Sequence, residues 1–527
     1  MLCFMYGDSC IVFNVLAQSY ARILKKARKK GGFSCMLDGF QLFLQYNVRG
    51  MSPGLNRLTP TMKGNYKLTW RERTGYCTGE LALNLIYQTV SIWLMFYYTN
   101  VYGLDPGTAA LLFLVVRIVD VIWDPFVGTF VDRAFPRWGK YRSWLWMGGI
   151  PLSLSAILCF WNGFGDSLVY ACVTYVALSM CFTLTSVPYG ALGDSLTRDT
   201  HELTVLTSVR MIFANIAGMM IKTLPLIIAL FAPKVLNPET GEMVAVYNTP
   251  EADRAWFITM SLFVLSGLVL LFYSFSQSHE KVLSDASKTQ SLKMKDLWME
   301  LVNNRPLRVL SAFFIIAFTT MSVSNASESY FMTYNLKATP FMTSAFMWLG
   351  TIPAFVFLPL VPAMKRRLGK KGMFYLFIGI SVAGMLLMYL TSSVEVLRGQ
   401  FWLLCVIQFV KNAGILVATG YMWALVPEVV TFGELVSGRR VAGIVTALIC
   451  IFMKAGMALG GVIPGLVLDW VGFRPGSSVQ SELTLQGIVW LVTLIPSLLM
   501  MLGAFVISRY ELTDKRMDEI NREITGK

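Results

Sequence analysis

Two carboxylates lie in the middle of an apolar stretch of this chain. Asp120 and Asp124 fall within residues 107–131, a run long enough to cross a bilayer. An ionised Asp near the bilayer centre costs roughly 2.5 to 3.5 kcal/mol, so it needs a cation, a proton or a basic partner there. Together with Arg117 they follow the spacing i, i+3 and i+7, which places all three on one face of a helix.

Two neighbouring carboxylates cannot both stay ionised and unpaired, so these residues either share protons or hold a hard cation such as sodium. This pattern favours a membrane protein that couples its work to an ion. The alternative is an Arg117–Asp120 ion pair that only locks helices together.

Further polar residues interrupt apolar segments elsewhere, where a role in a site or pathway is the default expectation. They are Glu80, Asn84, Arg210, Lys411 and Lys454. Glu80 is close enough to a segment end to reach the membrane surface instead, and for Lys411 and Lys454 a purely structural pairing stays open.

Glu328 lies in a polar run, residues 322–330, inside another apolar segment. Such a run is poorly tolerated against lipid and is expected to face a cavity, where its hydroxyls and amide suit a polyol ligand. A helix–helix seam of small residues is the alternative.

Composition excludes several classes of protein. The 527 residues are 55% hydrophobic and only 14% charged, with a mean hydropathy of +0.57, which is too apolar for a soluble protein. The net charge of +14 fits basic cytoplasmic loops better than nucleic-acid binding. Nine scattered cysteines and two histidines give no metal-ligand spacing, and the sequence has no P-loop. We therefore expect no enzyme activity, no cofactor and no metal beyond a possible Na⁺.

The elements that must position these residues are membrane helices, because apolar segments of spanning length recur along the chain. Twelve are expected, near residues 77–101, 107–131, 142–162, 167–193, 203–231, 255–277, 307–334, 341–364, 373–392, 399–427, 441–471 and 483–508.

Basic residues cluster at alternate breaks between these segments, around residues 133–142, 281–308, 365–371 and 439–440. The positive-inside rule then places both termini in the cytoplasm, with the protein in the cell or inner membrane.

The predicted organisation is an all-α membrane protein whose twelve helices form two six-helix halves. The first half covers residues 67–277 and the second 307–508. A cytoplasmic loop, 278–306, joins them, and 509–527 form a cytoplasmic tail. Residues 1–66 are expected to be a dispensable or poorly structured extension, with Met62 a natural start.

The chain resembles the glycoside–pentoside–hexuronide cation symporters, the melibiose permease group of the major facilitator superfamily. The resemblance covers about residues 66–510 and rests on motifs in the right order. These are GELALNL at 79–85, YYTNVYGL at 97–104, FLVVRIVDVIWDP at 113–125, RWGK at 137–140, VPYGAL at 187–192 and FGE at 432–434.

The resemblance implies the major facilitator fold, alternating access and a central sugar site. It implies that Asp120, Asp124 and Thr183 bind the cation. It also implies sugar-binding or coupling positions at or beside Glu80, Asn84, Ser186, Arg210 and Lys454, to which the polar-residue argument adds Arg117 and Glu328.

The chain departs from the family pattern at four positions. Trp123 stands where Asn is common, Ser186 where Asp or Asn is common, Thr431 where the family has Asp, and Ala442 where it has Glu. The loss of an amide oxygen at position 123 favours a proton over sodium as the coupling ion.

The expected function is import of a glycoside, oligosaccharide or sugar acid coupled to H⁺ or Na⁺, by a monomer in the lipid bilayer. A lipid or amphiphile carrier on the same scaffold is one alternative, and a non-transporting membrane sensor is another. The polar run at 322–330 favours a sugar ligand.

Overall fold

The computed structural model describes residues 67–525 except 135, 166, 198–199, 237–242, 282–293, 395–398, 438–441, 476 and 478. The chain divides into two units, Met1–Lys63 and Gly64–Lys527. The first unit lies outside the described residues, and so does the prediction of an N-terminal extension.

Helices dominate the part of the chain before residue 278. They are α3 (Trp70–Thr89), η1 (Val90–Leu94), α4 (Met95–Asn100), α5 (Pro106–Arg133), α6 (Arg142–Met147), α7 (Gly149–Cys159), α8 (Leu168–Leu196), α9 (Thr200–Lys222), α10 (Leu224–Phe231), η2 (Pro250–Ala252) and α11 (Asp253–Gln277). Their starts follow local chemistry. Thr69 and Glu72 form a reciprocal capping box at the start of α3, and α5 begins with a proline at its first position.

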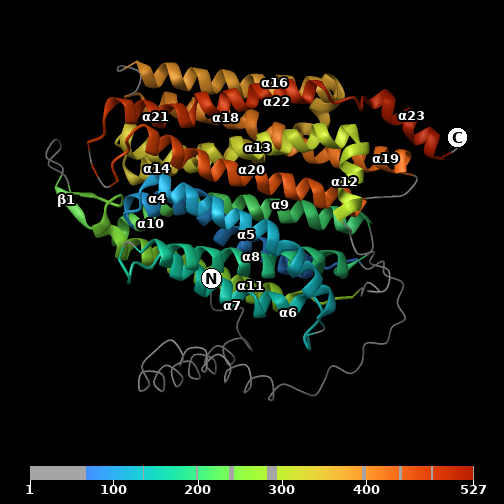
Figure 1. Ribbon diagram of the computed structural model, residues 1–527, viewed down its shortest axis with the longest axis horizontal. Helices are drawn as coiled ribbons and strands as arrows, with labels where there is room; N and C mark the ends of the chain where they lie inside the picture. The colour runs from blue at the N-terminus through green and yellow to red at the C-terminus, as the bar shows by residue number, and fades with distance from the viewer. Residues whose placement is uncertain are drawn as a thin grey trace. The chain divides into compact units, whose positions relative to one another are not determined.

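Helices also dominate the rest of the chain. They are α12 (Met294–Asn303), α13 (Arg305–Tyr330), η4 (Phe331–Asn335), α14 (Pro340–Leu349), α15 (Ile352–Phe357), η5 (Leu358–Leu360), α16 (Val361–Ser393), α18 (Phe401–Met422), η6 (Trp423–Leu425), α19 (Val426–Ser437), α20 (Ala442–Trp470), α21 (Glu482–Val492), α22 (Leu494–Ser508) and α23 (Asp514–Thr525). Figure 1 shows the long helices running side by side.

Ten stretches of described helix are long and apolar enough to cross a membrane. Each coincides with one of the twelve expected segments. The two other expected segments are also helical: α5 fills 107–131, while α6 and α7 share 142–162. The predominantly helical membrane architecture is therefore confirmed, whereas the count of twelve and the division into two halves stay predictions.

Three elements were not expected from the sequence. A short antiparallel hairpin pairs β1 (Lys234–Leu236) with β2 (Met243–Ala245), so the chain is not purely helical. The expected loop 278–306 contains α12, and the expected tail contains α23. Both helices place apolar side chains against a core formed by α13, α16, α19 and α20, and this packing stabilises short helices that periodicity across 20 residues does not reveal.

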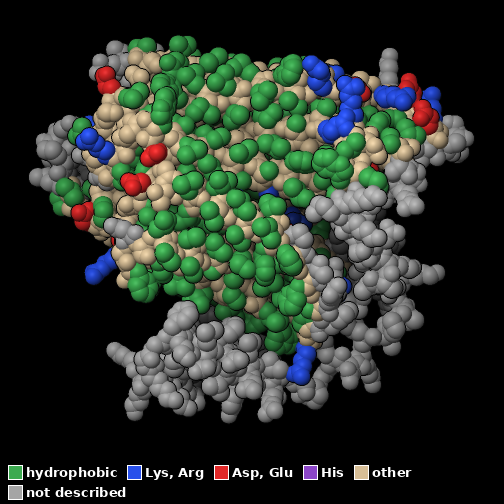
Figure 2. Space-filling model, in the orientation of Figure 1, with side chains coloured by type: hydrophobic (Ala, Val, Ile, Leu, Met, Phe, Trp, Pro, Cys, Tyr) green, Lys and Arg blue, Asp and Glu red, His purple; other side chains and the backbone are tan. Residues whose placement is uncertain are grey.

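The surface of the long helices is apolar. Side chains such as Ile118, Ile122, Phe126 and Phe130 are each more than half exposed along one side of α5. Figure 2 shows hydrophobic side chains across most of the described face, with a group of Lys and Arg side chains near the end that carries α23. Exposed apolar area of this extent fits contact with lipid.

The helices α3 and α13 each pass into a π-helical turn, η1 and η4. Near these turns the two helices are joined. The hydroxyls of Thr99 on α4 and of Tyr330 at the end of α13 lie 2.6 Å apart, and Tyr334 within η4 donates to the amide oxygen of Asn100. Nearby, Lys222 at the end of α9 donates to Thr351, 2.8 Å away. These polar contacts between 67–277 and 307–508 lie where Figure 1 shows α4, α10 and α14, at one end of the helices.

At the opposite end, where Figure 1 shows α12, α19 and α23, the ion pairs stay within one part of the chain. Arg73 pairs with Glu202 at 2.6 Å and Lys281 with Glu72 at 2.5 Å, all before residue 282. In the later part, Lys370 pairs with Glu428 at 2.8 Å, and Arg305 pairs with Glu511 at the same distance.

Candidate functional site

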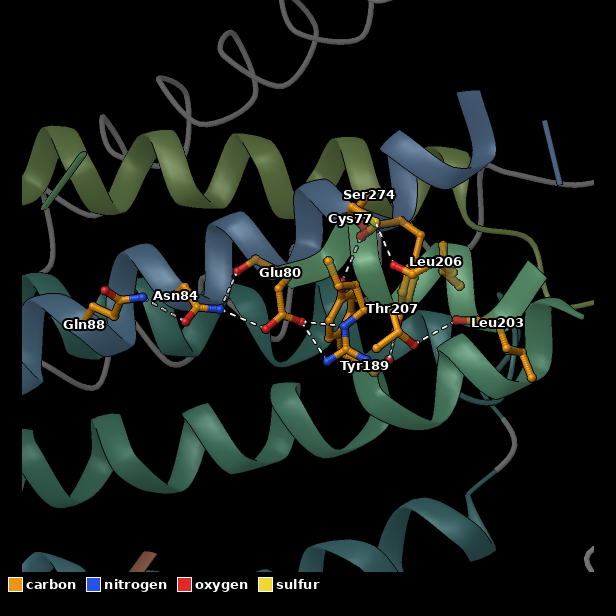
Figure 3. Close-up of polar contacts among 11 residues, drawn as sticks. Cys77, Glu80, Asn84, Gln88, Tyr189, Leu203, Leu206, Thr207 and Ser274 are labelled. Atoms are coloured by element: carbon orange, nitrogen blue, oxygen red, sulfur yellow. Dashed lines mark hydrogen bonds and ion pairs between the residues drawn. The ribbon is translucent and has the colours of Figure 1, made fainter. Parts of the chain in front are cut away.

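Glu80 on α3 and Arg210 on α9 form the first polar centre (Figure 3). The Nε of Arg210 donates to Glu80 Oε2 at 2.9 Å, and a terminal guanidinium nitrogen lies at the same distance. The side chains are 28% and 18% exposed for Arg210 and Glu80, although both lie well inside their helices. Two charged groups do not face lipid unpaired, so this pair is placed to meet a polar ligand or water.

Two stacked tyrosines form the base of this centre. The rings of Tyr76 and Tyr189 lie 4.7 Å apart, and each hydroxyl donates to the backbone carbonyl of the other residue, at 3.1 and 3.0 Å. The guanidinium of Arg210 lies over both rings. Gly79 allows the close approach, because a Cβ there would lie 2.6 Å from the Tyr189 ring. This contact explains the glycine before Glu80 and the tyrosine of the VPYGAL motif.

Amides extend this centre along α3. Asn84 donates to Glu80 Oε1 at 2.9 Å, and Gln88 donates to Asn84 Oδ1 at 3.1 Å. Gln88 also donates to the carbonyl of Ala214 on α9, at 3.3 Å. Figure 3 shows Glu80, Asn84 and Gln88 in a row along one helix. Such a row offers hydroxyl-binding groups over two turns.

Asp120 on α5 has both of its side-chain partners within residues 67–277. One oxygen accepts from Arg117 at 3.1 Å, and the other accepts from the hydroxyl of Ser179 on α8. The structure therefore contains the Arg117–Asp120 ion pair that the sequence offered as the alternative to ion binding.

Asp124 lies one turn further along α5 and has different partners. Thr183 of α8 donates to one carboxylate oxygen at 3.1 Å, and the ammonium of Lys454 on α20 contacts the other. The side chains of Asp124 and Lys454 are 27% and 29% exposed, against 7% for Asp120. Asp124 is thus the more accessible carboxylate, and its ion pair joins α5 to a helix from the later part of the chain.

Trp123 makes no hydrogen bond to either carboxylate among the described residues. Its N–H donates to the carbonyl of Met180 on α8 at 3.2 Å, and the ring packs against the core. The residue therefore brings no oxygen toward Asp120 or Asp124.

Glu328 on α13 lies in a separate, fully buried cluster. It accepts from the amide of Gln408 at 2.6 Å and from Lys411 at 3.4 Å, both on α18. The side chains of Lys411 and Glu328 are 0% and 3% exposed. Among the described residues, no hydrogen bond or ion pair joins this cluster directly to Asp120 or Asp124.

Most of the expected site residues are brought together in pairs. Ser186 is the exception: it is half-buried on α8 and has no side-chain hydrogen-bond partner among the described residues. The sequence arguments missed Ser179, Gln88, Lys222 and Gln408. Ser179 had a signal, since it precedes Thr183 by four residues just as Asp120 precedes Asp124.

No cluster of three or more His, Cys, Asp or Glu side chains able to hold a metal ion occurs in the part of the chain that the structure describes. The carboxylates are paired with bases or hydroxyls instead.

Comparison with known proteins decides the family. The model of the MFS/sugar transport protein family matches residues 75–514. The chain belongs to this family. The resemblance to the glycoside–pentoside–hexuronide cation symporters is thereby confirmed, and the chain is a membrane transporter rather than an enzyme.

Members of the sugar transport family resemble the chain over most of its length. It is 38% identical over 467 residues to the uncharacterized symporter YnaJ of Bacillus subtilis, covering 88% of this chain and 96% of that one. It is 31% identical over 470 residues to the glucuronide carrier protein homolog of Escherichia coli, covering 88% and 97%. A D-xylose–proton symporter of known structure shares the fold, with a TM-score of 0.58, 13% identity and coverage of 85% and 99%.

Proposed function

We propose that the chain imports a sugar together with a cation, H⁺ or Na⁺, by alternating access between two six-helix halves. The observation that carries this proposal is the ion pair between Asp124 and Lys454, with Thr183 bound to the same carboxylate. Asp124 belongs to the first proposed half and Lys454 to the second. A group that competes for this carboxylate therefore acts on the junction between the halves.

The coupling step follows from this geometry. A cation or proton that reaches Asp124 neutralises the charge that holds Lys454, so the attraction between α5 and α20 weakens. Neutralising Asp124 leaves the ammonium of Lys454 without its carboxylate, and that charge then needs a new partner. The change between the outward-open and inward-open states therefore depends on whether a cation or proton is bound at Asp124. Asp120, tied to Arg117 and Ser179, positions α5 against α8 during this step.

A proton is the proposed coupling ion. Sodium needs several oxygen ligands at one point, and the indole of Trp123 supplies none because its one polar group is an N–H donor, which bonds to the carbonyl of Met180. A proton needs a single accessible carboxylate, and the exposure of Asp124 meets this need.

The sugar is proposed to bind at Glu80, Asn84 and Arg210, with Gln88 beside them. These groups present both donors and acceptors, and the Glu80–Arg210 pair is partly open to solvent. The names of the family and of the glucuronide carrier homolog support a sugar as the cargo. We also propose a part for Ser186, which is half-buried on α8, three residues before the Tyr189 ring that lies under Arg210.

Both termini are proposed to lie in the cytoplasm. Apart from the Asp124–Lys454 pair, the polar contacts described above between 67–277 and 307–508 lie at the α4 and α14 end, while the ion pairs described at the α12 end stay within each part. Basic residues are concentrated at the α12 end, which the positive-inside rule assigns to the cytoplasm. In this arrangement the two proposed halves are in contact at the outer end and apart at the cytoplasmic end.

Uptake into proteoliposomes tests the proposal. An imposed inward ion gradient should drive accumulation of a labelled sugar above its outside concentration, and dissipating the gradient should reduce it to equilibration. Failure of both H⁺ and Na⁺ gradients to drive accumulation of any of a panel of glycosides and uronates would contradict it.

A further inference from the structure

A second group of charges lies outside the proposed ion and sugar centres. Glu328, Gln408 and Lys411 form a buried hydrogen-bonded group between α13 and α18. All three residues are at most 2% exposed. Ordinary helix packing does not need a lysine and a glutamate at this depth, because apolar side chains of similar volume pack there at no lower stability.

Lys222 brings a second ammonium group to this place. It ends α9, is 8% exposed, and donates to the hydroxyl of Thr351, 2.8 Å away. Thr351 follows Gly350, where a Cβ would lie 2.9 Å from the side-chain nitrogen of Gln408, so the ammonium of Lys222 reaches the edge of the group formed by Glu328, Gln408 and Lys411. Of the residues that the structure describes, none forms an ion pair with Lys222. The cluster therefore holds two basic groups and one carboxylate.

This imbalance sets the cluster apart from the other shielded pairs. Arg117 has Asp120, Arg210 has Glu80, and Lys454 has Asp124, one carboxylate for each basic group. A buried ammonium with only a hydroxyl as partner is costly, so intramembrane lysines of this kind mark ligand or ion pathways.

The cluster is also connected to the proposed sugar centre. Gln88 ends the row that begins at Glu80, and its amide oxygen would lie 2.7 Å from a Cβ at Gly218. Gly218 precedes Lys222 by one helical turn on α9. The row of polar side chains along α3 therefore ends beside α9, one helical turn before Lys222.

We infer that Lys222, Lys411 and Glu328 form a subsite for one negatively charged group, a carboxylate or sulfonate, on the transported sugar. This inference rests on the proposed function and narrows its cargo to acidic sugars. Glu328 balances one ammonium, and the anionic group of the cargo balances the other. Lys222 and Thr351 lie in different proposed halves, so separation of the halves at this end exposes the subsite.

Matched sugars test the inference with the purified full-length chain in detergent. The probes are methyl β-D-glucuronide, its C6-sulfonate counterpart and neutral methyl β-D-glucoside, each titrated at constant ionic strength while Tm is followed by intrinsic fluorescence. A charged hydrogen bond in a shielded site favours the acidic probes by about tenfold or more in half-saturating concentration. The carboxylate and sulfonate arms show which acid fits better.

Two variants separate recognition from folding. Lys222→Met should abolish the preference for acidic probes and leave the glucoside response unchanged. Glu328→Gln removes the competing carboxylate and should strengthen binding of the glucuronide by severalfold, a gain that loss of a merely structural contact does not produce. Lys234→Met, at an exposed position on β1, is the matched control and should behave as the wild type.

Equal half-saturation for glucuronide and glucoside, or no Tm shift with any probe, would overturn the inference. A preference for acids that survives Lys222→Met would do the same. Gradient-driven uptake of neutral glycosides with no preference for acids would leave the proposed function intact and remove only this subsite, whereas absence of gradient-driven sugar uptake would be a failure of the proposed function.

Discussion

Asp124 and Lys454 form an ion pair between two helices that are 330 residues apart in the chain, and Thr183 donates to the same carboxylate. The side chain of Asp124 therefore contacts α8, which belongs to the same proposed half, and α20, which belongs to the other. This position makes Asp124 the first residue to test.

Replacing Asp124 with Asn should abolish accumulation of sugar against a gradient, because an amide neither takes up a proton nor pairs with Lys454. The protein should still fold and insert, since the amide keeps the shape of the side chain. Uptake by proteoliposomes with and without an imposed gradient measures this. Asp105→Asn, at an exposed residue just before α5, is the control. Accumulation by Asp124→Asn at the wild-type level would refute the assignment.

The sugar centre should be sensitive to replacement of Arg210 with Lys. A lysine keeps the charge but loses the two-nitrogen contact with Glu80 and the stacking over Tyr76 and Tyr189. We expect sugar uptake at low concentration to fall by about tenfold or more. Initial rates over a range of sugar concentrations give the effect, with Arg71→Lys at an exposed position as control. Unchanged kinetics would remove Arg210 from the site.

Uptake should not require sodium. In sodium-free buffer an inward proton gradient should drive accumulation, because Trp123 supplies no oxygen for a sodium shell and Asp124 is accessible to protons. Measuring uptake in choline buffer, with and without added millimolar sodium, distinguishes the two ions. Uptake that vanishes without sodium and returns with it would assign sodium instead.

His279 should make the protein acid-sensitive. Partial desolvation of the ring, and then the positive charge of Arg142, hold the pKa of His279 below its ordinary value of 6.5, and the guanidinium of Arg142 lies 2.9 Å from Nδ1. The unfolded chain then binds more protons than the folded one, so the stabilisation is complete above pH 6.5 and is lost as the pH falls toward the lowered pKa.

Replacing His279 with Gln should consequently reduce the fall in Tm between pH 7.5 and pH 5.5, values that bracket the ordinary histidine pKa of about 6.5. Thermal unfolding of the purified protein at both pH values provides the comparison. An equal fall in Tm for wild type and variant would show that other groups dominate the acid response.

A chain that starts at Met62 should insert and transport normally. The capping box of Thr69 and Glu72 begins α3 after this point, so the helix start does not need the earlier residues. Membrane yield and uptake of the shortened and full-length proteins provide the measurement. Loss of insertion would give residues 1–61 a structural or targeting role.

The helices were predictable because a membrane-spanning segment can be recognised in the sequence by its length and its apolar composition. All twelve expected segments are mainly helical in the described residues. This includes 142–162, where the helix is interrupted between α6 and α7. The hairpin β1–β2 and the helix α12 were missed because they are short and stabilised by contacts distant in sequence.

The site was predictable only where partners share a helix. Arg117, Asp120 and Asp124 follow a spacing that fixes their common face, and the structure confirms the Arg117–Asp120 contact. The pairing of Glu80 with Arg210, across 130 residues, has no local signal. Lys222 was overlooked because it ends its helix and reads as a residue near the membrane surface, yet it is buried against Thr351.

The π turn η1 has a consequence for how α3 serves two partners. One additional residue in a helical turn rotates everything beyond it by roughly 100°. Glu80 and Asn84, before the turn, face α9, while Thr99 and Asn100, after it, bond to Tyr330 and Tyr334. The two parts of this helix thus present their polar side chains to different partners. Deleting one residue within Val90–Leu94 would rotate the side chains of α4 about the helix axis, while those of α3 would keep their contacts with α9.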